Sequence, residues 1–329
     1  MNKRFDILTG AQAAIGLHQR LGTESELGIT RGPVNVFGAL QKSNSVLMFR
    51  PLEGLLGACI KTPVSGVLIS TQRPLPVQRF TGAHELGHVA MEHSTSLDGE
   101  EILDGCKSLN SMEIQANAFA AEFLVPRWLL TIHAKAQGWN RDSLRNPDVV
   151  YQLSLRLGVS YDATTLALKN HNIVDQSTLS KLRSTQPRAI KMRLLTGYTP
   201  VNWHRDVWVL TEKDEGAVIE GQPDDLFLFR LNEKPGAGYL WNTEELKKQH
   251  LTIVKDVRID TEPEDAVGSD VQREVTATVA DPKIGEVEIA LKRPWQKLGT
   301  PAGALHVRYD FRGKERGLPR ASRIHLEAA

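Results

Sequence analysis

The chain has 329 residues, which is long enough for two domains that each bury a hydrophobic core. Hydrophobic residues make up 41% and charged residues 24%, and the formal net charge of +1 gives no indication of a nucleic-acid or acidic-membrane partner. No apolar run approaches the roughly 18 residues that span a bilayer, and two cysteines, Cys59 and Cys106, are too few for a disulfide-stapled secreted domain, so we expect a cytoplasmic protein.

The first 175 residues mix helical and strand-like patterns. Helical spacing predicts a helix over 9–21, which Gly22 ends, and helices over 80–93 and 112–125, the last of which Pro126 stops. Further helices are predicted over 142–169, with a break near Gly158. Between the first two helices, three pieces read as strands: 34–40, 45–52 and 65–70.

The last third of the chain has a different pattern. Residues 176–206 are predicted to form a basic helical linker. The usual interpretation of such a basic run is a helix face exposed to solvent. The alternative is that residues 153–193 contact DNA. From 207 to 329 the pattern is one of short alternating strands separated by turn residues, which favours a β-sandwich. The predicted strands are 207–212, 226–231, 238–241, 251–260, 273–280, 286–295 and 304–311.

The stretch RFTGAHELGHVAMEH, residues 79–93, carries the strongest chemical signal. His84 and His88 are four residues apart, so on a helix both imidazoles lie on one face and can bind one Zn²⁺ ion. Glu85 lies about 100° around the helix and does not ligate. It is placed instead to act as the general base, as in an H-E-x-x-H metallopeptidase.

A catalytic zinc takes three protein ligands, so a third one is expected downstream. Glu113 is the best candidate, because it lies in an alanine-rich helix where an acid is costly unless it is paired or bound to metal. Asn117 shares its helical face and is a candidate to support a ligand, whereas Glu122 is expected on the solvent side.

A structural interpretation stands beside this one. An HExxH match occurs by chance, and two histidines on one helix could be hydrogen-bonded core residues. His93 is expected at the surface or beside the ligands, and His133 in a structural role.

The segments RFTGAHELGHVAMEH and EIQANAFAAEFLVP together resemble the signature of the ImmA/IrrE family of metallopeptidases, over roughly residues 10–170. The resemblance implies an α+β zincin-like domain with zinc held by His84, His88 and Glu113 and with Glu85 as the base. It also implies a substrate class, namely helix-turn-helix transcriptional regulators cleaved in bacterial stress, phage or mobile-element responses.

The last third resembles the chagasin-type inhibitors of cysteine peptidases, over about residues 207–311. This resemblance implies an all-β immunoglobulin-like sandwich with three binding loops at one end. The matching positions are Pro235, Gly238 and Tyr239, then Gly268 within 267–269, then Arg293, Pro294 and Trp295. Gly236 and Ala237 replace the two threonines of the family's first loop, which puts inhibition of a cysteine peptidase in doubt. Trp241 is expected in the core.

The leading hypothesis is a zinc-dependent endopeptidase with an appended protein-recognition domain. The alternative is a catalytically silent pseudo-peptidase that acts as a protein-binding regulator or peptidase inhibitor. The intact set of His84, Glu85, His88 and Glu113 favours the enzyme.

Overall fold

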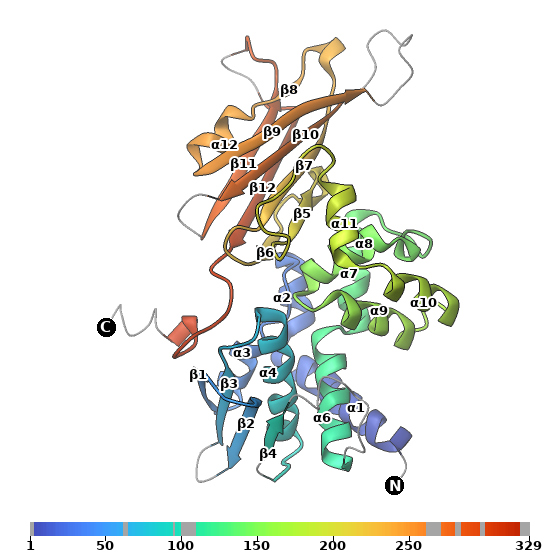
Figure 1. Cartoon of the computed structure of the whole chain (residues 1–329), viewed down its shortest axis with the longest axis vertical. Coiled ribbons are helices and arrows are strands. Elements are labelled where there is room, and N and C mark those ends of the chain that lie inside the picture. The colour runs from blue at the N-terminus through green and yellow to red at the C-terminus, as the bar shows by residue number, and fades with distance from the viewer. Residues whose placement is uncertain are drawn as a thin grey trace.

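The computed structural model describes residues 3–61, 65–94, 96–99, 110–260, 271–279, 284–296 and 300–322. It has a mixed N-terminal region, a group of helices beside it and a C-terminal β domain at the other end of the long axis (Figure 1). A helix-rich first part followed by a C-terminal β domain agrees with the sequence prediction. Within the described residues, no helix combines the length and apolarity needed to cross a membrane.

The N-terminal region is built around a four-stranded sheet of order β1-β3-β2-β4. Strand β1 (Val46–Arg50) runs parallel to β3 (Ser65–Ser70), whereas β2 (Leu55–Lys61) is antiparallel to both β3 and β4 (Ser96–Gly99). The helices of this region are α1 (Lys3–Leu21), α2 (Thr23–Thr30), α3 (Val36–Lys42), α4 (Leu75–Ala90) and α6 (Ser111–Leu124).

Helix α6 packs against both α1 and α4, and glycines allow the close approach on each side. A Cβ added at Gly87 of α4 would lie 3.1 Å from Phe119 Cβ, and one at Gly10 of α1 would lie 2.1 Å from the Gln115 carbonyl oxygen. Since real Cβ atoms do not approach backbone oxygens so closely, any larger residue at Gly10 would force α1 away from α6.

The helical region consists of α7 (Arg127–Gln137), α8 (Pro147–Leu157), α9 (Tyr161–Asn170), α10 (Gln176–Ser184) and α11 (Pro187–Leu194), with a short 3₁₀ turn at Ser143–Arg145. Gly138 and Gly158 end α7 and α8 in the left-handed conformation. The basic side chains of the last two helices are largely engaged within the chain: Arg183 pairs with Asp162, Arg193 with Asp148 and Lys191 with Asp206, and Arg188 lies over the Trp203 ring.

The β domain has two four-stranded sheets, of orders β5-β7-β10-β9 and β6-β12-β11-β8, which share one core. The first sheet contains β5 (Val207–Leu210), β7 (Leu226–Glu233), β9 (Leu251–Asp260) and β10 (Val271–Val279). The second contains β6 (Val218–Glu220), β8 (Leu240–Trp241), β11 (Ile284–Lys292) and β12 (Gly303–Asp310). Short helical segments lie at Glu212–Asp214, Pro235–Ala237 and α12 (Glu244–Lys248).

Strand β7 explains how this domain joins the rest of the chain. Its sequence LFLFRL is apolar on both faces. Phe227 and Phe229 point into the core between the two sheets, whereas Leu226 and Leu228 belong to the core of the N-terminal and helical regions. Tyr151 and Gln152 of α8 add hydrogen bonds to Asp206 and Val207 at β5.

The segment after β12 returns to the N-terminal sheet, and we call residues 312–322 the return segment (Figure 1). Gly317 and Phe49 of β1 exchange two backbone hydrogen bonds, of 2.7 and 2.9 Å. The Gln78 side chain of α4 donates to the Glu315 carbonyl and accepts from the Glu315 amide, at 3.1 and 2.8 Å. The outer edge of β1 is therefore covered by residues from the far end of the sequence.

Several sequence predictions were wrong in detail. Residues 36–40 of the predicted strand 34–40 lie instead in helix α3, because the Asn35 side chain accepts from the Gly38 amide and caps a helix that begins at Val36. Strands β2 and β6 and helix α7 were not predicted, and α1 and α4 begin earlier than expected, at Lys3 and Leu75. The breaks at Gly22, Pro126 and Gly158 lie at the ends of helices.

Candidate metal centre

Helices α4 and α6 bring the three predicted metal ligands together. The ligand atoms of His84, His88 and Glu113 all lie within 4.8 Å of one another. His84 Nε2 lies 3.1 Å from one Glu113 carboxylate oxygen and 3.0 Å from His88 Nε2, and His88 Nε2 lies 3.6 Å from the other carboxylate oxygen. Both imidazoles are buried and Glu113 is partly exposed.

These separations suit a tetrahedral zinc ion. Bonds of about 2.05 Å at tetrahedral angles separate neighbouring ligand atoms by about 1.63 times the bond length, or about 3.3 Å. The distances of 3.0, 3.1 and 3.6 Å bracket that value. Two imidazoles and one carboxylate are also a donor set that catalytic zinc uses, with a fourth position left for water or substrate.

The surroundings favour the ligand forms of these side chains. The neighbouring His84, and after it His88, hold the pKa of Glu113 well below its ordinary value, so its carboxylate is ionised at neutral pH. Asn117, one turn after Glu113, has its Oδ1 3.0 Å from His84 Nδ1. An amide oxygen can only accept there, so Nδ1 carries the proton and Nε2 keeps its lone pair for a metal.

Glu85 is fully buried between α4 and strand β2. A Cβ added at Gly57 of β2 would lie 2.7 Å from Glu85 Oε1 and 2.5 Å from Thr81 Cγ2. Only glycine at position 57 therefore leaves room for the carboxylate at this distance from the strand. The role of Glu85 as a base stays a prediction, which its burial next to a ligand histidine supports.

Three further side chains, His93, Gln115 and Asp6, extend the site behind His88. His93 lies 3.1 Å from His88 through their two Nδ1 atoms, and its Nε2 lies 3.0 Å from Gln115 Oε1. Gln115 Nε2 in turn donates to Asp6 Oδ1 at 2.8 Å. His93 stood among the sequence candidates as a neighbour of the ligands. Gln115 and Asp6 carried no local signal, because one lies in α6 and the other in α1.

His133 and Glu122 do not belong to the cluster of candidate metal ligands. His133 is buried and far along the sequence from the ligands, and burial, together with the charges of Arg156 and Arg31, lowers its pKa to about 3. Glu122 was expected on the solvent side, but it is partly buried and lies 4.0 Å from His171. Its pKa is raised, chiefly by burial.

Two of the three predicted loops of the β domain, at 235–239 and 293–295, lie together next to β8. Arg293 stacks over the Tyr239 ring at 4.7 Å and donates to the Ala237 carbonyl, and Trp295 packs over Gly238. Trp295 is 68% exposed and Trp241 is buried in the core, as expected. Residues 267–269, including Gly268, lie outside the described residues. The strands before and after them pair with each other at Asp260 and Val271, beside Glu233 at the end of β7.

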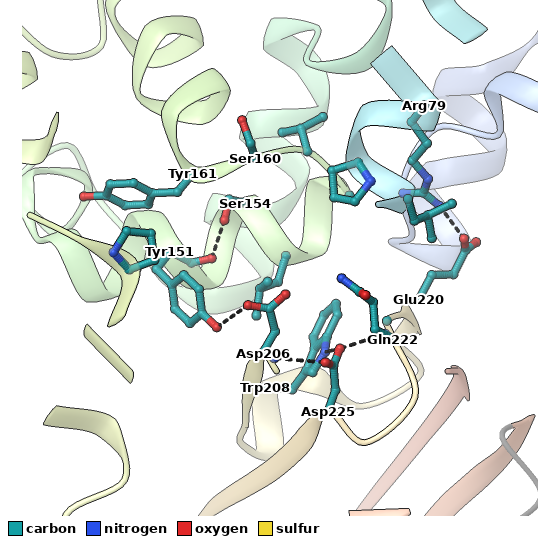
Figure 2. A pocket seen from close by; sticks show the side chains of 17 residues that line it. Arg79, Tyr151, Ser154, Ser160, Tyr161, Asp206, Trp208, Glu220, Gln222 and Asp225 are labelled. Atoms are coloured by element: carbon teal, nitrogen blue, oxygen red, sulfur yellow. Dashed lines mark hydrogen bonds and ion pairs between the residues drawn. The ribbon is translucent and has the colours of Figure 1, made fainter. Parts of the chain in front are cut away.

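A cavity of about 190 Å³ lies where α4, the helical region and the β domain meet (Figure 2). Arg79 of α4 forms an ion pair with Glu220 of β6 at its rim, and Tyr151 donates to Asp206. Burial and the charge of Asp206 raise the pKa of Asp225 to about 7. None of the three predicted metal ligands lines this cavity, but Arg79 lies on the same helix as His84.

Two family models match the chain. Residues 51–169 match the IrrE N-terminal-like domain of the peptidase M78 family, and residues 222–309 match the chagasin family of peptidase inhibitors. A curated relative, Amoebiasin-2 of Entamoeba histolytica, is 25% identical over 99 residues, which are 30% of this chain and 80% of the relative.

Two solved structures are similar to the β domain. The cysteine protease inhibitor EhICP2 from Entamoeba histolytica has 24% identity and a TM-score of 0.29 over 33% of this chain and 98% of that one. The solution structure of Amebosin has 15% identity and a TM-score of 0.24, over 32% and 98%.

Proposed function

Since the chain joins an IrrE N-terminal-like domain of the peptidase M78 family to a chagasin-family domain, we propose that it is a zinc-dependent endopeptidase with its own protein-recognition domain. The observation that carries the proposal is the convergence of His84, His88 and Glu113 beside the buried Glu85. In this proposal, residues 1–175 are a zincin-like peptidase domain, 176–206 a helical linker and 207–329 an immunoglobulin-like sandwich.

The residues divide the chemistry between them. Zinc, when bound, supplies Lewis acidity toward a water molecule and a peptide carbonyl. His84 and His88 hold the ion through Nε2, with the opposite nitrogen of His84 directed to Asn117. The Glu113 carboxylate completes the donor set and offsets part of the ion's charge. Glu85 accepts the proton of the attacking water on its carboxylate, and delivers it to the leaving amine.

The proposed substrate is a protein, and the class we favour is a helix-turn-helix transcriptional regulator of a bacterial stress, phage or mobile-element response. Within this proposal the protein works in the cytoplasm. DNA contact by residues 153–193 has little support, because Arg183, Lys191 and Arg193 already pair with carboxylates of the chain.

The loop end of the β domain is proposed to bind the protein substrate or a regulator. Arg293, Tyr239 and Trp295 form one continuous surface there, and these residue types are enriched at binding hot spots. This surface and helices α4 and α6 lie at opposite ends of the long axis (Figure 1). Recruitment of a separate protein therefore fits the arrangement better than loops that cover the chain's own metal centre.

The first test uses the Glu85→Gln variant. It should bind about one zinc per chain like the wild type, yet lose cleavage, because the amide cannot accept the proton while all three ligands remain. Each protein is co-expressed with a candidate helix-turn-helix regulator, taken first from the neighbouring gene if that gene encodes one, and fragments are sought by mass spectrometry. Glu113→Gln is the contrasting variant and should lose zinc affinity.

Two outcomes would contradict the proposal. A Glu85→Gln protein that still cleaves would remove Glu85 from the role of base. Wild-type protein that does not bind zinc tightly would favour the pseudo-peptidase alternative, in which the β domain carries the activity.

The second test addresses the loops. Trp295→Ala should weaken binding of the regulator by about 2 kcal/mol, or about 30-fold, if Trp295 is an anchor of the interface. Calorimetry on the Glu85→Gln background measures this without cleavage. Val201, which is fully exposed and lies outside the loop end, gives the control Val201→Ser. Equal affinities of the two variants would show that this end does not bind the regulator.

A further inference from the structure

A buried arginine nitrogen lies at the cavity between α4, the helical region and the β domain (Figure 2). Arg79 of α4 is 4% exposed, and its Nη2 forms the ion pair with Glu220 of β6. Its Nη1 is buried as well, but has no hydrogen-bond partner among the described residues. A Cβ added at Gly158 would lie 1.6 Å from Nη1, so this nitrogen lies against a wall of the cavity.

The unpaired nitrogen of Arg79 indicates what a bound molecule has to supply. Buried donors in folded proteins nearly always have an acceptor, because a donor without one has lost its water and gained nothing in return. Glu220 satisfies only one nitrogen of the guanidinium group. A molecule in the cavity with an oxygen acceptor would satisfy the other, which the described residues do not.

Gln222 adds a second available group, from the β domain. Its backbone amide donates to Asp225, but its side chain forms no hydrogen bond within the described part of the chain. Figure 2 shows this side chain projecting into the cavity. Since a side-chain amide offers both donors and an acceptor, a ligand that carries an amide of its own is its natural complement.

The other walls restrict the size and charge of a ligand. The cavity has a volume of about 190 Å³, and an apolar cavity of about 150 Å³ holds a benzene molecule, so a ring with one polar group fits. Leu155 and Val159 give this ring apolar contacts. An anion is disfavoured, because Arg79 is already paired with Glu220 while Asp206 and Asp225 add two more carboxyl groups. A cation would leave the arginine nitrogen without an acceptor.

We propose that this cavity binds a small uncharged molecule in which an amide group is attached to a ring. The ligand oxygen accepts from Arg79 Nη1, the ligand amide pairs with Gln222, and the ring packs against Leu155 and Val159. None of the candidate metal ligands lines the cavity, so the site is separate from the metal centre. Binding there goes beyond the proposed peptidase function and does not depend on it.

Three probes with the same ring test the chemistry: uncharged benzamide, the anion benzoate and the cation benzylamine. Each is titrated into the full-length protein in the presence of EDTA, and the indole N–H signal of Trp208 is followed by NMR. This group lines the cavity and donates to Asp225. Benzamide should shift the signal with a Kd of about 1 mM, as expected for a ligand of its size. Benzoate and benzylamine should bind at least about tenfold more weakly. Trp295, which is exposed at the loop end, is the internal control, and its signal should not move.

Variants test the two polar contacts. Arg79→Lys keeps a cation opposite Glu220 but lacks the second nitrogen, so benzamide should bind about tenfold more weakly. Arg145→Lys makes the same change in an ion-paired arginine outside the cavity and should bind like the wild type. Gln222→Leu has a similar volume and gives up no hydrogen bond within the described part of the chain. It should therefore keep the wild-type melting temperature, yet also bind benzamide about tenfold more weakly.

Thermal melting establishes that each variant is folded, and Gln222→Leu decides if Arg79→Lys is not. A Trp208 signal that benzamide does not shift in a saturable way would overturn the proposal and leave the cavity to water alone. Benzoate or benzylamine that binds as tightly as benzamide would overturn the assigned chemistry, as would unchanged benzamide affinity in the folded variants. Because zinc and cleavage enter none of these measurements, such a result would leave the proposed peptidase standing.

Discussion

At the scale of single residues, buried histidines couple stability to pH. His133 has its pKa lowered to about 3 by burial and by two arginine charges, whereas an unfolded histidine titrates near 6.5. The unfolded chain therefore binds a proton below pH 6.5 that the folded chain does not. The stability that neutral His133 contributes is complete above that pH and falls as the pH drops toward 3.

His133→Leu should remove this dependence. Between pH 7.5 and 5.5 the wild type should lose about 1.4 kcal/mol more of its free energy of unfolding than the variant does. Urea unfolding in the presence of EDTA at both pH values measures the difference. His204 is exposed, so His204→Leu is the control and should keep the wild-type loss. Equal losses in the wild type and His133→Leu would mean that His133 takes up its proton over the same pH range in the folded and the unfolded protein.

The cluster of candidate ligands could be predicted because the signal of its members is local. His84 and His88 face the same way through helical geometry alone, and Glu113 stands out as an acid in an apolar helix. Asp6 and Gln115 could not be found in this way. They are 109 positions apart, and only the packing of α1 on α6 brings them together. Local spacing predicts what one helix does, and support from a second helix needs the tertiary structure.

At the scale of elements, strand β2 and helix α4 are close enough that one methyl group should matter. A Cβ at Gly57 would overlap Thr81 and the Glu85 carboxylate. Gly57→Ala should therefore displace Glu85 and reduce cleavage at least tenfold, and should cost about 1–3 kcal/mol of stability through overpacking. Zinc content should stay unchanged, because His84, His88 and Glu113 are not among the groups that a Cβ at position 57 meets first.

The neighbouring strand supplies the control for this prediction. A Cβ at Gly66 of β3 meets nothing closer than 4.0 Å, so Gly66→Ala should keep full activity. Cleavage assays, metal analysis and thermal melting on the two variants give the comparison. Normal cleavage by Gly57→Ala would show that the carboxylate has room to move.

Elements were predicted well where apolar periodicity agreed with the end signals, as in α6, α8 and β3. They were predicted badly where the two signals conflicted. Residues 34–40 alternate in polarity like a strand, but the Asn35 cap starts a helix. The continuous apolar run of β7 correctly predicted a strand, but the sequence alone did not indicate what covers each of its two apolar faces. The reason is that Leu226 and Leu228 pack on the helical region.

At the scale of the whole molecule, the β domain is structurally integrated with the rest. Removing residues 200–329 would take Leu226 and Leu228 out of the core of the N-terminal and helical regions. It would also remove the hydrogen-bond acceptors of Tyr151 and Gln152 at β5. Loss of cleavage after that truncation would not by itself demonstrate substrate recruitment. Substitutions in the exposed loop end are therefore the cleaner test of recognition.

The return segment should make the ends of the molecule unfold together. Deleting residues 312–329 removes both hydrogen bonds of Phe49 with Gly317 and leaves the buried Gln78 amide without two of its partners, at about 1–3 kcal/mol for each unsatisfied group. We expect a single calorimetric transition in the wild type and two in the deletion variant. Deleting only 323–329 keeps every one of these contacts and should preserve the single transition. One transition in both variants would show that the core contacts alone couple the regions.

The return segment also fixes an order of events during synthesis. Phe49 and Gly317 are 268 positions apart, and at about 5–20 residues per second the ribosome needs roughly 15–50 s to add that length. Until then β1 lacks the backbone hydrogen bonds at its outer edge. Gln78 lies on the helix that carries the HExxH motif, and its side chain lacks its hydrogen bonds with the Glu315 backbone. A nascent chain cut short anywhere before residue 317 cannot close this edge. The N-terminal sheet is therefore completed last, by residues that follow the β domain in the sequence.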